Sequence, residues 1–242
     1  MSDPLVLRPL VREPLVLLPG MMCDARLFGP QIKALGKDRA IHLPPVGAHD
    51  TIEAVARDVL RDAPERFALA GLSLGGIIAM EVVRLAPERV SRLALMDTNP
   101  LAETPKVAAN RDPQIARVMA GLLPEVMREE MKPAYLADTP QRNAILDLVL
   151  EMALDQGEGV FLRQSRALQK RFDQQATLRK LHVPTLILCG VDDALCPVRR
   201  HEFMAELIQP AELVIIDGAG HLPTLEQPEK VTGAMTRWLD RL

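Results

Sequence analysis

The stretch Gly71-Leu72-Ser73-Leu74-Gly75-Gly76 places a serine between glycines, directly after the apolar run Phe67-Ala68-Leu69-Ala70. This order predicts a strand that reverses sharply at the serine and continues as a helix, which is the geometry of a nucleophile elbow. Glycine is expected at 71 and 75, because a side chain there would clash with the strained turn. The first amides of the helix, led by that of Leu74, would face negative charge near the serine oxygen. Ser73 is therefore a candidate nucleophile.

A serine nucleophile needs a base, and His221 is the best candidate among five histidines. It ends the glycine-rich segment Asp217-Gly218-Ala219-Gly220-His221, which follows the apolar run Leu213-Val214-Ile215-Ile216. A loop at the end of a strand can present an imidazole to a serine on another strand. The other histidines are expected to be structural or solvated, because none lies in a glycine-flanked loop after a strand; they are His42, His49, His182 and His201.

The imidazole in turn needs a carboxylate that fixes its tautomer and stabilises its charged form. Asp192 and Asp193 follow the strand-like run 185–190 and precede His221, which gives the chain order Ser, Asp, His. Asp97 ends an earlier strand and could reach the same space. We expect Asp97 to cap the turn 98–100 instead, since aspartate is common in that role.

These segments resemble the α/β-hydrolase superfamily, in particular its small, cap-bearing serine esterases. The resemblance covers nearly the whole chain and rests on residues 17–21, 71–76, 183–197 and 218–228. It implies that Asp193 is the triad acid, because the family's acid is usually the third residue after the glycine that ends the strand. It also implies that the backbone amides of Met21 and Leu74 form the oxyanion hole.

One departure from the family pattern lies beside that oxyanion hole. Relatives usually carry His-Gly where this chain has Pro19-Gly20. The change keeps the amide of Met21, but proline cannot make the hydrogen bonds that a histidine side chain could make.

Composition is consistent with a cytoplasmic enzyme that has one core and one insertion. The chain has 242 residues, of which 48% are hydrophobic, so a substantial core is available. The net charge of -3 predicts no general attraction to nucleic acid or to membranes.

The first twenty residues contain charges and no long apolar run, so we expect neither a signal peptide nor a membrane anchor. The odd number of cysteines, Cys23, Cys189 and Cys196, predicts free thiols. Cys23 lies near the oxyanion segment, where we expect a buried structural thiol.

The pattern of apolar runs predicts an α/β fold, namely the α/β-hydrolase fold with a mostly parallel sheet and helices on both faces. Runs of strand length lie at 15–18, 39–43, 67–70, 92–96, 185–189 and 213–216. Helical periodicity appears from Ile52, with Thr51 as its N-cap, and again at 231–238. A shortened opening hairpin is expected over 5–11.

Residues 100–178 contain no convincing strand and are expected to form an inserted helical cap, with 1–99 and 179–242 as the core. Asp112 and Thr139, each before a proline, are predicted as helix N-caps, and Gly157 and Gly159 as a helix end. An adaptable apolar acyl site is predicted from Met127, Met131 and Met152, with Met21 and Met22 beneath them. The basic residues of the cap, which could contact an acidic substrate or carrier protein, are expected to form a solvated face; they are Arg163, Arg166, Lys170 and Arg171.

The sequence therefore predicts a serine hydrolase that cleaves a small to medium carboxylic ester through an acyl-enzyme. No metal or organic cofactor is expected, and the expected partner is a small-molecule ester, with the oligomeric state open. One alternative is a carbon-carbon bond hydrolase or lyase of the menaquinone-pathway or meta-cleavage type. Such an enzyme would need cationic pocket groups for a substrate carboxylate, and Arg111 is a candidate. A perhydrolase is a further alternative, and a non-catalytic binding protein is disfavoured because both Ser73 and His221 are present.

Overall fold

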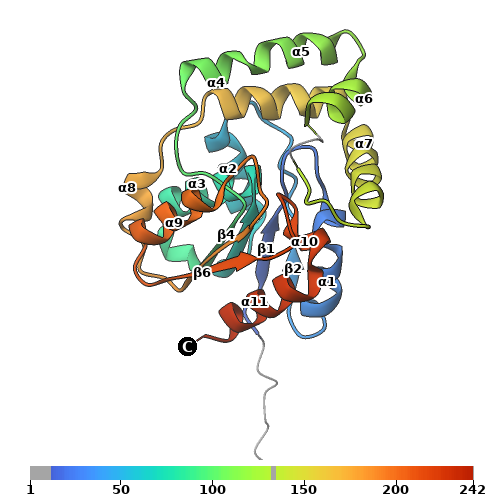
Figure 1. Ribbon diagram of the computed structural model, residues 1–242. Helices are drawn as coiled ribbons and strands as arrows, with labels where there is room; N and C mark the ends of the chain where they lie inside the picture. Colours follow the sequence, from blue (N-terminus) through green and yellow to red (C-terminus); the bar gives the residue numbers. More distant parts are fainter. Residues whose placement is uncertain (1–11, 132–134, 242) are drawn as a thin grey trace, which may run out of the picture.

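The computed structural model describes residues 12–131 and 135–241, and its centre is one parallel sheet (Figure 1). Six strands of the described residues pair in the order β2-β1-β3-β4-β5-β6. Their bounds are Leu15–Leu18 (β1), Ile41–His42 (β2), Phe67–Leu72 (β3), Val90–Met96 (β4), Thr185–Gly190 (β5) and Ala211–Ile216 (β6). Each strand was expected from an apolar run, although β2 is shorter than predicted. The expected hairpin at 5–11 lies outside the described residues.

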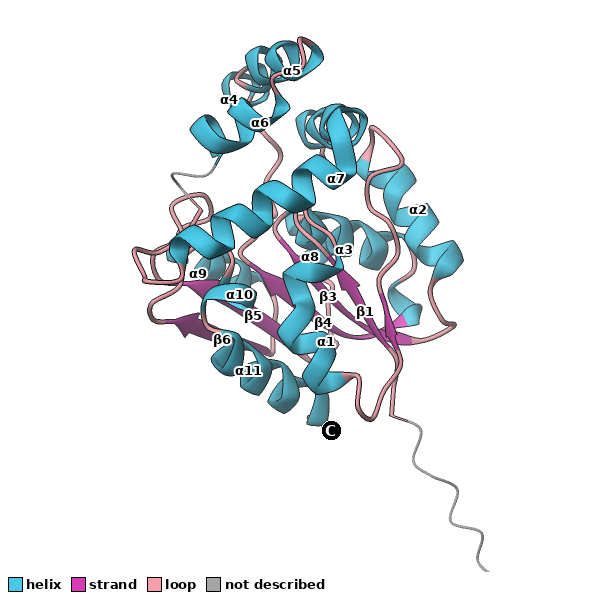
Figure 2. Ribbon diagram, turned by 90° about the vertical axis from the view of Figure 1, so that its right-hand side faces the viewer, coloured by secondary structure: helices cyan, strands magenta, loops and turns pink. Residues whose placement is uncertain are grey.

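Helices cover both faces of the sheet (Figure 2). The helices α1 (Gly29–Leu35) and α11 (Pro228–Asp240) pack together on one face. On the other face lie α2 (Ile52–Asp62), α3 (Leu74–Leu85) and α9 (Val198–Leu207). The strands β1, β3, β4 and β5 are almost completely buried, as expected for a parallel sheet that is covered on both faces, whereas the edge strands β2 and β6 are partly exposed except at Ile216.

The strand register determines where the functional site can form. Leu72 at the end of β3 pairs with Met96 of β4, and Met96 pairs with Leu188 of β5. The residues that follow these strands therefore meet at the carboxyl edge of the sheet, where open α/β sheets bind their ligands.

Every element between β4 and β5 in the described residues is helical. Figure 1 shows α4, α5 and α7 stacked beyond the carboxyl edge of the sheet. The bounds are Pro105–Ala109 (α4), Arg111–Met119 (α5), Leu123–Val126 (α6), Met127–Met131 (η3, a π-helical turn), Arg142–Gln169 (α7) and Gln175–Leu178 (α8). The expected cap segment 100–178 thus consists of helices, while its action as a lid stays a prediction.

Some helix ends differ from the predicted ones. Thr51 caps α2 as expected, because its side chain accepts a hydrogen bond from the Ala54 amide. Asp112 is not an N-cap: α5 begins one residue before it, and Asp112 lies in the first turn. Thr139 is not an N-cap either, because α7 begins at Arg142. In both cases the helix begins at a different residue from the proline that was predicted to be its first residue.

Gly157 divides α7 into two helical parts. Its backbone has φ 77° and ψ 174°, which is not helical, so one helix ends there and a second continues after a kink to Gln169. The predicted helix end at Gly157 is therefore confirmed, and glycine adopts this conformation at little cost. No helix within the described residues has both the length and the apolar character that a membrane span needs.

Candidate active site

The turn between β3 and α3 has the geometry that the glycine spacing predicts. Ser73 lies between the two elements with φ 54° and ψ -115°, a region that non-glycine residues rarely occupy. A Cβ at Gly71 would overlap the backbone of Gly75, and a Cβ at Gly75 would overlap the Leu18 carbonyl. Strand, turn and helix can pack this closely only because both positions lack a side chain.

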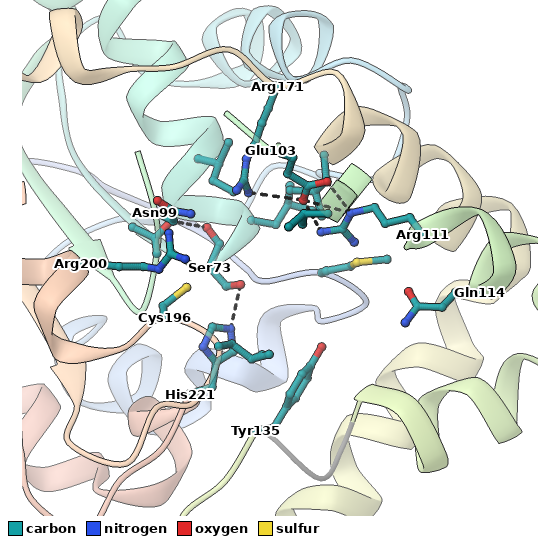
Figure 3. Close-up of a pocket in the computed structure, with 17 residues that line it drawn as sticks. Ser73, Asn99, Glu103, Arg111, Gln114, Tyr135, Arg171, Cys196, Arg200 and His221 are labelled. Atoms are coloured by element: carbon teal, nitrogen blue, oxygen red, sulfur yellow. Dashed lines mark hydrogen bonds and ion pairs between the residues drawn. The ribbon is translucent and has the colours of Figure 1, made fainter. Parts of the chain in front are cut away.

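Ser73, His221 and Asp193 form a continuous hydrogen-bonded chain at the carboxyl edge of the sheet. Ser73 Oγ lies 2.9 Å from His221 Nε2, and His221 Nδ1 lies 2.8 Å from Asp193 Oδ2. His221 and Asp193 are both 3% exposed, so water competes little for these contacts. The three residues come from three separate segments, after β3, β5 and β6, and Figure 3 shows the contact between the serine and the imidazole.

Backbone donors fix the carboxylate of Asp193. Its Oδ1 accepts hydrogen bonds from the amides of Leu195 (2.8 Å) and Cys196 (2.9 Å), which leaves Oδ2 to His221. Burial acts to raise the pKa of Asp193, but the hydrogen bonds from His221 and the two amides outweigh it and lower the pKa. Asp193 is therefore ionised at neutral pH. Asp192, the neighbouring candidate, is exposed.

The sequence predicted that Asp97 caps the turn 98–100, and this prediction is wrong. Its side chain is completely buried and accepts a hydrogen bond from the Gly190 amide at 2.9 Å. Burial and the nearby negative charge of Asp193 raise the pKa of Asp97 well above its usual value. Asp97 thus does reach the space of the triad acid, but as a buried group whose protonated form is favoured and which joins the ends of β4 and β5.

The loop that carries His221 is held by Glu226, which the sequence analysis did not single out as functional. The Glu226 carboxylate accepts hydrogen bonds from the amides of Gly220 and Leu222 on both sides of the histidine, and from Ala137. Burial raises the pKa of Glu226, although these three amides oppose that shift. A glutamate five residues after a loop histidine is the signal that could have indicated this role.

The turn after β1 is fixed by α7. Met22 has a positive φ of 55°, and its amide donates a hydrogen bond of 2.9 Å to Gln164 Oε1. Gln164 is 1% exposed, and its amide nitrogen also reaches the Val46 carbonyl. The neighbouring residue, Met21, lies in the wall of the same cavity as Ser73 and Leu74. Nothing in the sequence around Gln164 predicts that its side chain contacts the turn after β1.

A cavity of about 320 Å³ contains Ser73 and His221 in its wall. The inserted helices contribute Arg111, Gln114 and Leu168 to the same wall. Met22, Met127 and Met152 are fully buried and lie in the core instead, so they do not form the acyl pocket that was expected from them. The side chain of Met131 lies outside the described part of the structure. Met21 is the methionine that does reach the cavity.

Three arginines line this cavity, and they differ in their contacts with acidic side chains (Figure 3). Arg111 makes a bidentate pair with Glu103, with contacts between 2.6 and 3.1 Å, while Glu103 itself is 1% exposed. Arg171 is 10% exposed and lies 3.9 Å from the same carboxylate. Arg171 was expected on a solvated face. It follows the end of α7, and its side chain lies in the cavity wall. Arg200 on α9 has no ion pair with any acidic group of the described residues.

Of the three thiols, only that of Cys196 lies in the cavity wall, and within the described residues it belongs to one group of possible metal ligands. Cys23, Cys189 and Cys196 are free, and burial raises the pKa of Cys23 to about 12, so it is a poor nucleophile. Asp193, Cys196 and His221 offer ligand atoms within 4.8 Å of one another. Asp193 and His221 already bind each other, and burial raises the pKa of Cys196, so the arrangement suits proton transfer better than metal binding.

The sequence profile of the alpha/beta hydrolase family matches residues 15–234, so the chain belongs to this family. It is 28% identical, over 236 residues, to a pimeloyl-acyl-carrier-protein methyl ester esterase of Aromatoleum aromaticum, covering 90% of this chain and 94% of that protein. A thermophilic esterase from Thermogutta terrifontis, solved with malate bound, has 29% identity and a TM-score of 0.86, with 95% and 90% covered. The enol-lactonase from Burkholderia xenovorans, at 20% identity and a TM-score of 0.84 over 95% and 92%, shares the fold.

Proposed function

We propose that this α/β hydrolase cleaves carboxylic esters through an acyl-enzyme formed on Ser73. The observation that supports the proposal most directly is the chain from Ser73 Oγ through His221 to Asp193, which opens into a cavity. Nucleophile and base are within hydrogen-bond distance, and a third group orients the base, which is the arrangement that serine acyl transfer requires. The relatives named as esterases support the same class of reaction.

In the proposed mechanism, Ser73 Oγ attacks the ester carbonyl while His221 Nε2 takes the hydroxyl proton. Asp193, ionised by its hydrogen bonds, stabilises the resulting imidazolium. The imidazolium then protonates the alcohol as it leaves. Water attacks the acyl-enzyme with His221 again as base, which releases the acid and restores Ser73.

The amides of Met21 and Leu74 are the proposed oxyanion donors. Leu74 is the first residue of α3, so its amide has no acceptor within the helix and lies at the positive end of the helix dipole. Both residues line the cavity with Ser73. A donor fixed before the reaction needs no reorganisation as charge develops, and the contact of Gln164 with Met22 holds the second donor's turn in place.

The inserted segment 100–178 is proposed to act as a cap that selects the substrate, because its residues form part of the cavity wall. The experiment that tests the function is a hydrolysis panel of p-nitrophenyl esters from short to long acyl chains, with wild-type protein and Ser73→Ala. We expect turnover that depends on Ser73 and falls for acyl groups too large for about 320 Å³. Ester hydrolysis by Ser73→Ala at the wild-type rate would refute the assignment.

The carbon-carbon bond hydrolase or lyase remains a second candidate, because the cavity holds the cationic groups that such a substrate would need. Arg111, Arg171 and Arg200 all line it. A ring-cleavage dienone in the same panel separates the two, since cleavage of the dienone in preference to every ester would favour the second candidate. Addition of peroxide to the ester assay tests for perhydrolysis.

A further inference from the structure

The wall around Ser73 carries more positive than negative charge. The arginines Arg111, Arg171 and Arg200 face a single carboxylate, that of Glu103. The wall's other ionisable side chains besides His221 do not supply negative charge, since burial raises the pKa values of Tyr135 and Cys196. Asp193 lies behind His221 and makes its hydrogen bond with His221 Nδ1 there. The cavity is therefore cationic before any ligand enters.

Glu103 forms a full ion pair with Arg111, but it leaves Arg171 and Arg200 without a hydrogen-bonded acidic partner among the described residues. Its two oxygens are engaged by Arg111, and the nearest approach of Arg171 is 3.9 Å, beyond hydrogen-bond distance. The Nε atoms of Arg171 and Arg200 are both buried and have no acceptor within the described residues. A buried donor without an acceptor is costly, and the cost is greater on a charged group. Both side chains line the cavity, so an anion there would compensate their positive charge.

The location of Arg200 connects this charge to the reaction. It comes from α9 and reaches the cavity beside Asn99 and Cys196, close to Ser73 (Figure 3). In this view the guanidinium of Arg171 lies between Arg200 and Glu103, and Arg111 lies beyond Glu103. A guanidinium presents two parallel donors that match the two oxygens of a carboxylate. A cavity of about 320 Å³ is at the small end of ligand pockets, so the ester and the anion must belong to one compact molecule.

We propose that the substrate is a small ester that carries a free carboxylate, which Arg200 and Arg171 bind while Ser73 attacks the ester group. This inference rests on the proposed esterase function and adds the class of substrate. Arg111 and Glu103 form the fixed pair that orients Arg171. Hydrolysis consumes one water. It releases a dicarboxylate and an alcohol when the free carboxylate is on the acyl side, and a monocarboxylate and a hydroxy acid when it is on the alcohol side.

The test compares esters that differ only in the charged end. Monomethyl glutarate is matched by methyl pentanoate, and acetoxyacetate by ethyl acetate, so the two pairs place the carboxylate on the acyl side or on the alcohol side. We expect kcat/KM for the charged member of one pair to exceed its neutral partner by about 10- to 100-fold, mainly through KM, as for hydrogen bonds to a charged group. The substrate pair in which the charged ester is preferred shows whether the carboxylate belongs on the acyl side or on the alcohol side of the ester.

Variants of α9 provide the matched controls. Arg200→Gln should reduce the charged-over-neutral preference by about 10-fold, and Arg200→Lys should keep more of it, because the charge remains. Arg199→Gln removes an exposed charge from the same helix and should leave the preference as in wild type. Thermal unfolding of each variant checks that it folds. An equal loss in Arg199→Gln would mean that general electrostatics, and not this contact, sets the preference.

Binding separates this inference from the proposed function. Ser73→Ala should bind monomethyl glutarate in calorimetry, and Ser73→Ala with Arg200→Gln should bind it about 10-fold more weakly. Equal kcat/KM values within both substrate pairs would overturn the inference while the esterase stands. Ester turnover that survives in Ser73→Ala would overturn the function, whatever the binding result. Inhibition of the wild-type enzyme by inorganic phosphate as strong as by glutarate would overturn the assignment to a carboxylate.

Discussion

The substitution Asp193→Asn tests the proposed triad at the point where the chain offers competing carboxylates. Asp193 uses Oδ1 for the amides of Leu195 and Cys196 and Oδ2 for His221. In the variant, the two amides require the carbonyl oxygen of the asparagine at the Oδ1 position. The NH₂ group must then face His221 Nδ1 and can only donate.

The consequence is a change of tautomer. With a donor facing Nδ1, the ring carries its proton on Nε2, the atom that lies 2.9 Å from Ser73 Oγ. The imidazole can then no longer accept the serine proton, and the charged form loses its carboxylate. A loss of about ten-thousand-fold in kcat is known for such a change in a serine triad, which corresponds to about 5 kcal/mol of barrier at 1.36 kcal/mol per factor of ten.

The assay is kcat on p-nitrophenyl acetate under saturating conditions, with thermal unfolding as a check of the fold. Asp192→Asn is the matched control, because this side chain is exposed and one residue away, and it should stay within about 2-fold of wild type. Asp97→Asn should lose far less than Asp193→Asn, because the protonated Asp97 already resembles a neutral amide. A loss in Asp97→Asn larger than in Asp193→Asn would move the acid to the end of β4 and refute the assignment.

Three further predictions concern the nucleophile, the buried acid and the oxyanion turn. Phenylmethanesulfonyl fluoride should add once, to Ser73, and far more slowly in His221→Ala, as measured by peptide mass spectrometry; equal rates would show that Ser73 is not activated. Because the raised pKa of Asp97 makes the folded state hold a proton more tightly than the unfolded chain, wild-type stability should fall as pH rises through that pKa. The melting temperature of Asp97→Asn relative to wild type should therefore increase as the pH rises above the usual aspartate pKa of about 3.9 toward the raised pKa of the folded state, and a constant difference would contradict this. Gln164→Leu should lower kcat about 10-fold with little change in KM, because the turn beside Met21 loses its anchor; an effect on KM alone would place Gln164 in substrate binding.

The local features of the chain could be predicted from the sequence because they depend on a few adjacent residues. The elbow follows from the spacing of Gly71, Ser73 and Gly75, where steric exclusion acts between neighbours. All six strands followed from apolar runs of strand length, and Thr51 capped its helix as expected. The N-cap expectations at Asp112 and Thr139 failed because the packing of the inserted helices, and not the Asp-Pro or Thr-Pro pair, decides where those helices begin.

The placement of single charged and polar side chains could not be predicted in this way. Asp97 looked like a turn cap, but the register between β4 and β5 brings the Gly190 amide to it. Arg171 looked like part of a solvated face, but in the structure it lies 3.9 Å from Glu103 in the cavity wall. Each of these contacts joins residues that are far apart in the sequence, so no local pattern contains it.

The sequence by itself therefore determined the fold, the strained serine and the order in which serine, aspartate and histidine occur, because short-range sterics and apolar periodicity specify them. Only the tertiary structure decided which carboxylate is ionised and which is protonated, since that depends on burial and on backbone donors from other strands. It also decided the charge of the cavity. Three arginines and one carboxylate line it because segments far apart in the sequence meet near Ser73, and electrostatic fields depend on distance in space and not on separation along the chain.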